Sequence, residues 1–410
     1  MLSRRQFLLA MGAGATGVVL VGCADGNPSS LPSATGSLPT IEPVPGSSVA
    51  PSAATPSAPS TPTPSPASEL DLRQKIAQML LVGFRGRTIA EAAGTVADIR
   101  DRGLGGVVLF DYDAPTARYR RNIDSPAQLR ALIAGLRAAA AVPLLVAIDE
   151  EGGQVDRLKP RYGFPATESA AALGARDDAA YTRRRARAIG ATLAGLGIDL
   201  DLAPVVDLDV NPMNPIIGAL DRSFSAHPAV VTRQGRAFLD GLHDAGVAGA
   251  LKHFPGHGSS TRDTHLGWVD VTATWTRAEL EPFRDIIASG STDAVLVAHV
   301  FDSRLDPTYP ASLSRAVITG LLRGELGFDG VVISDDLQMG AIRTVYGYET
   351  AVERAILAGT DVLTIANEQV YEPGVVGRTI DIVAAAVSAG RIAESRIDAS
   401  WERIRRLKRV

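Results

Sequence analysis

Residues 247–258 read VAGALKHFPGHG, and this stretch indicates how the chain is folded. The apolar run from Val247 to Leu251 is typical of a buried strand. It is followed at once by lysine and histidine and then by Pro255 and Gly256, a combination that excludes a helix and predicts a polar loop leaving the end of the strand. Loops that follow a rigid strand are a common place for function.

Similar apolar runs occur eight times after residue 69, separated by helix-like stretches. They lie at 79–83, 105–110, 143–148, 198–206, 247–251, 294–298, 330–333 and 361–365. Two of the intervening helices have a capping-box start, Ser125 to Gln128 and Thr276 to Glu279. Continuous apolar strands alternating with helices predict a parallel sheet, and eight repeats predict an α/β fold with a single (β/α)8 TIM-type barrel. An open, doubly wound sheet is the alternative.

Polar side chains follow six of these runs where each strand is expected to end. They are Asp149, Glu150 and Glu151 after the third run, Asp207 and Asp209 after the fourth, Lys252 and His253 after the fifth, His299 after the sixth, Ser334, Asp335 and Asp336 after the seventh, and Asn367 and Glu368 after the eighth. In a barrel these strand ends meet on one face, which carries the active site. Carboxylates so close to an apolar core are costly unless paired or used, so the pattern predicts a functional site.

Three of the six histidines lie close together, at His253, His257 and His265. With Asp263 they could form a zinc site, although Pro and Gly prevent the first two from sharing a helix face. They could also be hydrogen-bonded residues of a polar loop. In the third interpretation Asp263 accepts a hydrogen bond from one ring nitrogen of His265 and leaves the other free to exchange protons with a substrate.

The charge balance excludes one class of partner. The 410 residues contain 41 Lys and Arg against 45 Asp and Glu, without a basic run, which gives no footprint for nucleic acid. No phosphate-binding loop and no G-x-S-x-G elbow is present in the sequence. A G-x-G-x-x-G match at 12–17 follows no strand, so it is not a dinucleotide site.

The amino end predicts export and a lipid anchor. Residues 3–8, SRRQFL, resemble a twin-arginine signal, and an apolar run leads to Leu20-Val21-Gly22-Cys23, which looks like a lipobox. We therefore expect a signal peptide at 1–22 and lipidation of Cys23. Residues 23–68 are rich in Ser, Pro, Ala and Thr and predict a disordered linker before a catalytic domain at 69–410.

Four motifs, in this order, carry a resemblance that covers about residues 70–410. They are Asp149 to Arg157 (DEEGGQVDR), Asp221 to Phe224 (DRSF), Lys252 to Gly258 with Asp263-Thr264-His265, and Ser334 to Met339 (SDDLQM). Together they resemble glycoside hydrolase family 3 β-N-acetylglucosaminidases of the NagZ type. Many relatives have Gln where this chain has Glu150 and Ser where it has Thr264; neither position carries the chemistry in that pattern.

The resemblance implies roles for eight residues. Asp335 would be the nucleophile and the Asp263/His265 pair the acid/base. Asp149, Arg157, Arg222, Lys252 and His253 match positions that hold N-acetylglucosamine. From the residues alone, Asp336 could replace Asp335, and the two arginines could be surface ion-pair partners. We expect His257 to be structural, leave His299 open, and note that Trp268 and Tyr346 could either stack on a sugar or pack within loops.

The implied activity is a retaining exo-β-N-acetylglucosaminidase that removes terminal N-acetylglucosamine from peptidoglycan fragments through a glycosyl-enzyme intermediate, without metal or organic cofactor. We expect a monomer, exported and lipid-anchored to the outer face of the cytoplasmic membrane or in the cell wall. Three alternatives stay open: a phosphorylase using the same site, since a histidine acid is neutral after protonating the leaving group, a non-catalytic glycan-binding lipoprotein, and a metal-dependent hydrolase.

Overall fold

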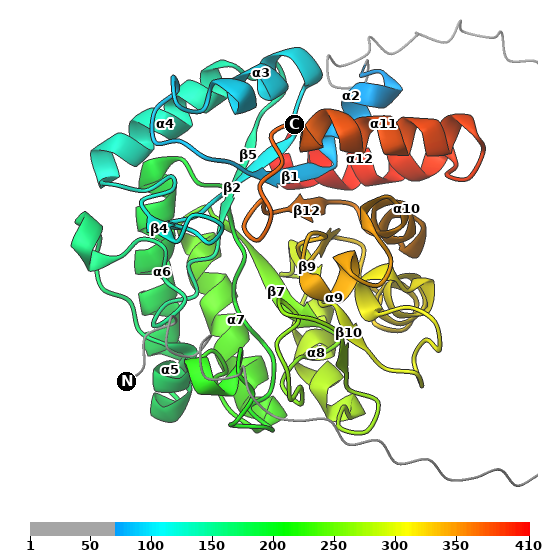
Figure 1. Cartoon of the computed structure of the whole chain (residues 1–410). Coiled ribbons are helices and arrows are strands. Elements are labelled where there is room, and N and C mark those ends of the chain that lie inside the picture. The colour runs from blue at the N-terminus through cyan, green and yellow to red at the C-terminus, as the bar shows by residue number, and fades with distance from the viewer. Residues whose placement is uncertain (1–69) are drawn as a thin grey trace, which may run out of the picture. The chain divides into compact units, whose positions relative to one another are not determined.

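Eight strands of the computed structural model lie side by side in residues 70–410, the part of the chain that the structure describes (Figure 1). In chain order they are β1 (Leu80–Gly83), β2 (Gly106–Leu109), β5 (Leu145–Ile148), β6 (Leu200–Asp201), β7 (Ala248–Phe254), β9 (Ala294–Val297), β11 (Val331–Ser334) and β12 (Leu363–Ile365). Their order in the sheet is β11-β9-β7-β6-β5-β2-β1-β12, and all neighbours are parallel. This matches the eight predicted apolar runs.

The two edges of this sheet also meet. Val362, just before β12, forms a parallel bridge with Ile333 of β11. The amide of Asp361 donates to the carbonyl of Val332 at 2.8 Å. The contact nearly closes the sheet, so the predicted barrel is confirmed and the open doubly wound sheet is wrong.

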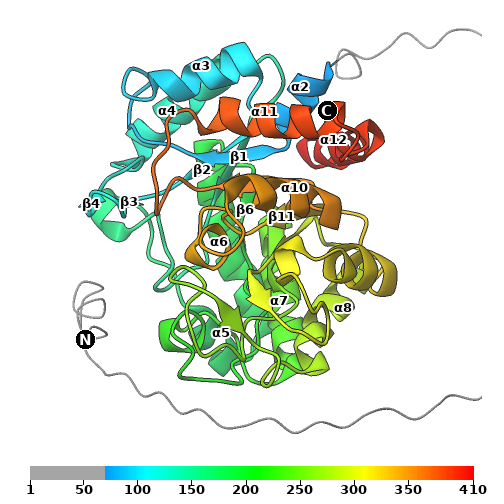
Figure 2. The same ribbon diagram turned by 45° about the vertical axis from the view of Figure 1, so that its right-hand side comes forward.

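Helices cover the outside of the barrel (Figures 1 and 2). They are α2 (Leu72–Gln78), α3 (Ala93–Arg102), α4 (Pro126–Ala138), α5 (Ala170–Arg176), α6 (Ala179–Leu196), α7 (Pro228–Asp244), α8 (Glu281–Ala288), α9 (Gly340–Arg343), α10 (Tyr348–Ala358), α11 (Val375–Ser388) and α12 (Glu394–Lys408), with a π-helix, η6 (Ala316–Glu325), and the 3₁₀ turns η2 (Pro160–Tyr162), η3 (Gly218–Leu220), η4 (Arg277–Leu280) and η5 (Ala311–Leu313). The strands are buried on both faces, which explains their continuous apolar sequences.

Two short strand pairs lie in the loops that follow the barrel strands. β3 (Tyr112–Asp113) pairs with β4 (Arg118–Tyr119) in the loop after β2. β8 (Val269–Asp270), in the loop after β7, pairs with β10 (Val300–Phe301), in the loop after β9. The loops on the carboxyl-terminal face of the barrel are therefore partly ordered by their own hydrogen bonds.

The fourth and fifth predicted strands need correction. Only Leu200–Asp201 of the predicted run 198–206 forms a strand, because Pro204 has no N–H to donate. β7 continues past the predicted end at Leu251 through Phe254, whose carbonyl accepts from the amide of Ala298 at 2.8 Å. Lys252 and His253 thus lie on the strand, and the loop begins at Pro255.

One predicted helix start is also wrong. Ser125 does accept from the amide of Gln128 at 3.3 Å, and Pro126 begins α4 as expected. Thr276, however, begins the 3₁₀ turn η4 without a side-chain cap. The Oε2 of Glu279 instead accepts from the amide of Gly258 at 3.0 Å, so this carboxyl supports the loop after β7 rather than a helix end.

The first helix is tied to the last two, and both views show α2 beside α11 and α12 (Figures 1 and 2). Arg73 pairs with Asp381 of α11 at 2.5 Å, and Lys75 pairs with Asp398 of α12 at 2.6 Å. The ammonium of Lys408, in α12, donates to Gln78 at 2.6 Å. These contacts close the helical ring where its two ends meet.

The signal peptide expected at 1–22, the lipidation of Cys23 and the linker expected at 23–68 lie outside the described residues. Within residues 70–410, none of the helices combines the length and the apolar character that crossing a membrane requires.

Candidate active site

Asp149, Glu150 and Glu151 directly follow β5, and their side chains alternate in direction. Asp149 and Glu151 both bind the Nζ of Lys252, at 2.7 Å and 2.6 Å. Glu150 points to the other side, where its Oε2 accepts from the amide of Arg157 at 2.9 Å. Successive side chains of an extended chain point in opposite directions, so the first and third share one cation while the second supports the neighbouring loop.

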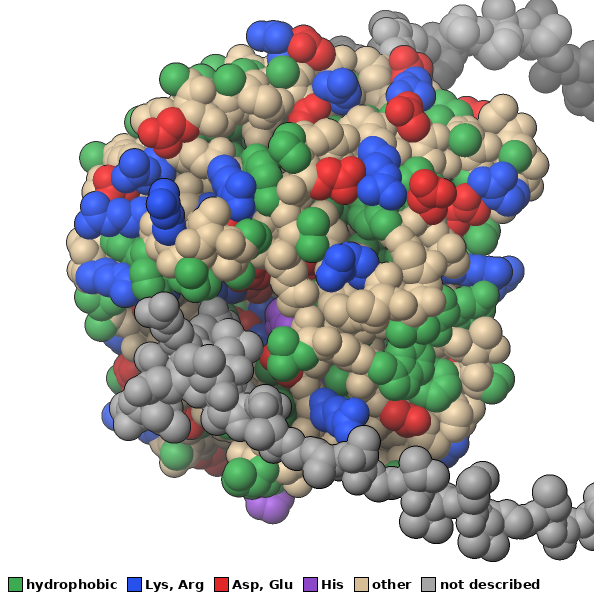
Figure 3. All heavy atoms as spheres, in the orientation of Figure 1, with side chains coloured by type: hydrophobic (Ala, Val, Ile, Leu, Met, Phe, Trp, Pro, Cys, Tyr) green, Lys and Arg blue, Asp and Glu red, His purple; other side chains and the backbone are tan. Residues whose placement is uncertain are grey.

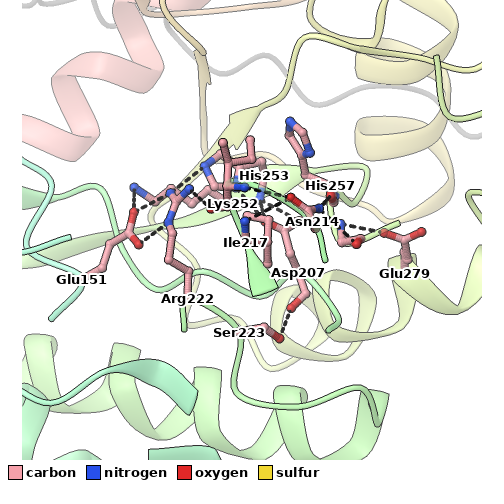
Figure 4. Close-up of polar contacts among 12 residues, drawn as sticks. Glu151, Asp207, Asn214, Ile217, Arg222, Ser223, Lys252, His253, His257 and Glu279 are labelled. Carbon is pink, nitrogen blue, oxygen red and sulfur yellow. Dashed lines mark hydrogen bonds and ion pairs between the residues drawn. The ribbon is translucent and has the colours of Figure 1, made fainter. Parts of the chain in front are cut away.

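Arg222, in the loop after β6, holds Glu151 with two hydrogen bonds of 2.7 Å, from Nε to Oε2 and from Nη2 to Oε1. Figure 4 shows Arg222 and Lys252 converging on this carboxylate. Burial would raise the pKa of Glu151, but the charges of Arg222 and Lys252 outweigh it and lower that pKa. Two cations and two carboxylates therefore form one ionised, fixed cluster. The surface ion-pair alternative for Arg222 is wrong, because only a tenth of its side chain is exposed.

His253 connects this cluster to a buried carboxylate. Its Nδ1 lies 2.6 Å from the Oδ2 of Asp207, and its Nε2 lies 3.3 Å from the Nη2 of Arg222. Arginine only donates hydrogen bonds, so Nε2 accepts and the proton of a neutral ring lies on Nδ1. Asp207 also accepts from the amide of His257 at 2.7 Å, which fixes the start of the loop after β7 (Figure 4).

Arg157 lies at the edge of the cluster with donor capacity to spare. Its Nη2 is 3.7 Å from the Oδ2 of Asp149, and its Nη1 is 4.0 Å from the Oδ1 of Asp111. Its buried Nε has no hydrogen-bond partner among the described residues. Burial lowers the pKa of Arg157, but Asp149, Glu368 and Asp111 outweigh it and raise that pKa. A cationic side chain with an unused N–H is suited to bind a polar ligand.

Asp263 and His265 form a pair in the loop after β7. The Nδ1 of His265 lies 2.7 Å from the Oδ1 of Asp263, while its Nε2 makes no hydrogen bond with the described residues. The side chain of His265 is 44% exposed. Desolvation by the surrounding loops lowers the pKa of His265, but Asp263, Asp335 and Glu368 outweigh it and raise that pKa. The arrangement matches the predicted pair, with one ring nitrogen held and the other free.

Asp336, the second of the two aspartates after β11, is turned toward the backbone. Its Oδ1 accepts from the amides of Gln338 and Ala366 at 3.1 Å and 3.0 Å. Burial raises the pKa of Asp336 to about 7. The side chain therefore fastens the end of β11 to the end of β12.

Asp335 has different surroundings and forms no ion pair with the described residues. Its Oδ1 accepts from the amide of Asp336 at 2.9 Å. Burial would raise the pKa of Asp335, but the imidazoles of His299, His253 and His265 outweigh it and lower that pKa. Asp335 is thus an anion whose second oxygen has no hydrogen-bond partner among the described residues.

His257 and His299 are both buried, and their ring nitrogens contact neighbouring segments. The Nε2 of His257 lies 3.3 Å from the Oγ1 of Thr264, and burial lowers the pKa of His257 to about 4. His299 donates from Nε2 to the carbonyl of Asp336 at 2.9 Å and accepts at Nδ1 from Ser312 at 2.6 Å. Burial also lowers the pKa of His299. His257 thus steadies the loop that carries the Asp263/His265 pair.

The zinc interpretation of the histidine cluster is wrong for the described residues. His253 and His265 use Nδ1 in separate bonds to Asp207 and Asp263. Across residues 70–410, no group of three or more His, Cys, Asp or Glu side chains is placed to hold a metal ion.

The geometry brings the predicted residues together on the carboxyl-terminal face of a parallel barrel, and the sequence comparison shows which family this arrangement belongs to. Residues 71–407 match the family described as glycosyl hydrolase family 3 N terminal domain. The chain belongs to glycosyl hydrolase family 3.

Relatives of this family 3 chain include a beta-hexosaminidase from Xylella fastidiosa, 40% identical over 323 residues that cover 76% of this chain and 91% of that protein. Among solved structures, a family 3 beta-N-acetylglucosaminidase from a Paenibacillus species is 40% identical, with a TM-score of 0.76 over 83% of this chain and 62% of that one. A beta-N-acetylhexosaminidase from Beutenbergia cavernae is 31% identical, with a TM-score of 0.75 over 83% and 99%. The resemblance is confirmed: the chain is a glycoside hydrolase of the β-N-acetylhexosaminidase class.

Three residues of this site carried no assigned role in the sequence. Glu151, the centre of the ionised cluster, was visible only as the third acidic residue after a strand, two positions from Asp149. Asp207 orients His253, and its signal was a carboxylate at the end of the fourth apolar run. Glu368 raises the pKa values of both Arg157 and His265, and its place after the eighth run was the one indication.

Proposed function

We propose that this family 3 enzyme removes terminal β-linked N-acetylglucosamine from peptidoglycan fragments with retention of configuration. The observation that carries the proposal is the pairing of His265 with Asp263, which leaves the Nε2 of an exposed, proton-binding imidazole free, while His265 and the anionic Asp335 act electrostatically on each other. An acid for the leaving oxygen and a carboxylate for the anomeric carbon are what a retaining glycosidase needs.

In the first step, the free oxygen of Asp335 attacks the anomeric carbon while the N–H at Nε2 of His265 protonates the glycosidic oxygen. The carbon–oxygen bond to the leaving sugar breaks, and a glycosyl ester of Asp335 forms. Asp149, Arg157, Arg222, Lys252 and His253 hold the sugar during this exchange. Their preformed network supports such a role, because the groups are already oriented before substrate arrives.

In the second step, His265 accepts a proton from water, and the water oxygen displaces Asp335 from the anomeric carbon. Because His265 is neutral at that moment, phosphate could replace water, which makes phosphorolysis the alternative outcome. Glu368 argues against it, since its negative charge acts on the same imidazole and would repel an anionic acceptor. A non-catalytic glycan-binding protein would not need an oriented, proton-binding His265 beside an anionic Asp335.

The substrate assignment rests on the predicted location of the enzyme. The twin-arginine pattern at residues 3–8 and the lipobox ending at Cys23 support export and lipid anchoring. A protein anchored outside the cytoplasmic membrane would meet cell-wall glycans, which contain N-acetylglucosamine. We therefore propose wall-derived saccharides as substrates and the outer face of the membrane as the working place.

The activity is tested with the whole chain and N-acetylglucosaminyl-β-1,4-N-acetylmuramic acid, following the anomeric proton of the released sugar by NMR with and without phosphate. We expect the β-anomer to appear first and no sugar 1-phosphate. In His265→Ala with added azide and a p-nitrophenyl β-N-acetylglucosaminide, whose leaving group departs without an acid, we expect a β-glycosyl azide, because azide needs no general base. An exposed histidine, His227, gives the matched control His227→Ala, which should behave as the unmutated chain.

An initial α-anomer would contradict the retaining route, and a 1-phosphate product would replace hydrolysis by phosphorolysis. Binding of the disaccharide without turnover would support the alternative of a non-catalytic glycan-binding protein.

The anchor is tested by expressing the chain and Cys23→Ala in a bacterium with lipoprotein processing. We expect the unmutated protein in the membrane fraction with a diacylglyceryl mass on its amino-terminal peptide, and the variant without that mass. An unmodified Cys23 in the mature protein would refute the anchor and leave the catalytic proposal intact.

A further inference from the structure

Arg157 is the least firmly bonded of the residues proposed to hold the sugar. Lys252 and Arg222 both bind the carboxylate of Glu151 within 2.7 Å. The guanidinium of Arg157 lies 3.7 Å from the carboxylate of Asp149, and its Nε has no hydrogen-bond partner among the described residues. The position of this side chain therefore depends on the backbone that carries it.

Trp268 and Tyr346, the aromatic residues considered for stacking on a sugar, are engaged with each other. Their rings lie 6.3 Å apart, and the ring of Trp268 lies 4.8 Å from that of Phe301. Both thus pack within the loops, the second of the two alternatives that the sequence left open. Figure 3 shows basic, acidic and histidine side chains inside a hollow of the molecular surface. We therefore expect the binding of a sugar to depend on charged groups such as Arg157.

Glu150 fixes the backbone at Arg157. Its Oε2 accepts from the amides of Arg157 and Leu158 at 2.9 Å and 3.0 Å. Glu150 is itself held in place, because it follows β5 closely and its own amide donates to the Oδ1 of Asp201 at 2.9 Å. One carboxyl oxygen thus joins the end of a barrel strand to the residue that carries the guanidinium.

The chain between Glu150 and Arg157 forms a tight loop. Gly152 has a φ of 89°, in the left-handed region that favours glycine. A Cβ atom there would lie 2.3 Å from the carbonyl oxygen of Glu168, so there is no room for one. The amide of Gly152 also donates to the carbonyl of Val155 at 3.1 Å. The loop is therefore closely packed, and the hydrogen bonds of Glu150 close it.

Glu150 lies beside a second buried carboxyl group, that of Asp156. The two residues are 2% and 6% exposed, and neither forms an ion pair within residues 70–410. Their side chains are within hydrogen-bonding reach of each other. The Oδ2 of Asp156 accepts from the hydroxyl of Thr167 at 3.0 Å, but its buried Oδ1 has no partner among the described residues. A proton on Glu150 would supply the missing donor and remove the repulsion between two anions.

The surroundings of Glu150 favour that proton. Burial, and after it the charges of Asp156 and Asp201, raise the pKa of Glu150. The cavity beside Glu150 is lined mainly by apolar side chains, and the arginine among them, Arg185, is already paired with Glu168 at 2.8 Å. No cation is therefore placed to favour the ionised form of Glu150 within the described residues.

We propose that Glu150 positions Arg157 for binding the sugar, and that it does so as a neutral carboxylic acid. Its Oε2 accepts from the amides of Arg157 and Leu158, while its O–H donates to the Oδ1 of Asp156. An ionised carboxylate could only accept. Glu150 is a positioning residue, because it acts through Arg157. The inference rests on the proposed function, in which Arg157 holds N-acetylglucosamine.

The test measures the Kd of N-acetylglucosamine for the whole chain by calorimetry, and kcat and KM with the p-nitrophenyl glycoside. Glu150→Gln keeps the shape, one acceptor and one donor, so all three values should stay within about threefold. Glu150→Leu leaves the amides unpaired, so Kd and KM should rise by about tenfold or more, with a smaller change in kcat. The control Thr182→Val, which removes a buried hydrogen bond of 2.7 Å to Gln234, should leave Kd unchanged.

A double variant separates positioning from other effects. In a chain that already carries Arg157→Ala, Glu150→Leu should weaken binding no further, because the residue through which it acts is gone. Full additivity of the two changes would overturn the proposal. So would an unchanged Kd in a folded Glu150→Leu variant, with the activity left in place.

Infrared spectroscopy tests the proton and needs neither turnover nor the Glu150→Leu variant. At neutral pH the unmutated chain should show a C=O stretch of a protonated carboxylic acid that Glu150→Gln lacks. The absence of that difference, or binding as weak in Glu150→Gln as in Glu150→Leu, would overturn the neutral acid. If the unmutated, folded chain neither turns over the glycoside nor binds N-acetylglucosamine, the proposed function fails, and the role given to Arg157 with it.

Discussion

The two sides of the active site are built in opposite ways. On the side proposed to bind the sugar, Lys252 is 1% exposed and bridges two carboxylates that follow a different strand. On the side proposed to transfer the proton, the side chain of His265 is 44% exposed, and its one side-chain partner, Asp263, is two residues away. The first side is fixed by long-range ion pairs within the barrel, whereas the second depends on a local turn.

This difference indicates that the two sides of the site have separate roles in the proposed reaction. The sugar must be held in one orientation for attack at its anomeric carbon. The groups of a buried, preformed network are already ordered before the sugar binds. The acid must protonate an oxygen and then let a leaving group depart, which requires access to solvent. Asp335 stands where the two sides meet, because the imidazoles of both His253 and His265 act on its charge.

The largest expected effect comes from this meeting point. Asp335→Asn removes the attacking carboxylate and should lower kcat by about 10⁴-fold or more. Asp336→Asn is the matched control: its oxygen would still accept from Gln338 and Ala366, and with a pKa near 7 the residue is already partly neutral. Its kcat should stay within about tenfold. Equal losses in the two variants, measured by disaccharide turnover, would contradict the assignment of Asp335.

Removing the ion pairs of Lys252 should lower the stability of the folded protein. Lys252→Met leaves the partly buried Asp149 and the buried Glu151 without the cation they share, and we expect a loss of about 3–5 kcal/mol in the free energy of unfolding in urea. Lys75→Met, which breaks the more exposed pair with Asp398, should cost less than about 1 kcal/mol. Similar losses in both would mean that the buried cluster is not what holds this side.

Altering the local side should change the pH dependence with little loss of stability. In the proposed mechanism catalysis needs a protonated His265, so activity should fall as pH rises through the pKa of His265, which Asp263 helps to raise above the ordinary value of 6.5. Asp263→Asn removes that charge, and the alkaline limb of kcat/KM should therefore move to lower pH. At neutral pH the loss should be on the order of 10²-fold. If the alkaline limb of kcat/KM does not shift, a group other than His265 is responsible for it.

The barrel was predictable because its eight strands are continuous apolar runs, a pattern that few other folds share. The residues at which the strands end were less predictable. Pro204 interrupts the fourth strand. Lys252 and His253, which the sequence places in a loop, belong to β7. Polar side chains are accepted in this buried strand because they pair with residues that follow other strands, which no local sequence pattern reveals.

The predicted site residues were those that follow apolar strands, and the structure does gather them. Apart from the Asp263/His265 pair, their partners could not be predicted, since those pairings join distant segments. Glu279 is an example: four residues fitted a helix cap, yet its carboxyl supports Gly258, twenty-one positions earlier. The local sequence predicts which side chains lie at the strand ends. The tertiary fold of the closed barrel determines which of them are in contact.

The ties between the first helix and the last two have a mechanical consequence. A pull on the chain upstream of Leu70 would load α2 first, and Arg73, Lys75 and Gln78 would pass that force to α11 and α12. α2 leads into the amino end of β1, whereas the proposed catalytic residues lie beyond the carboxyl ends of the strands. An enzyme held by its amino end could therefore bear tension without deforming the pocket in which it works.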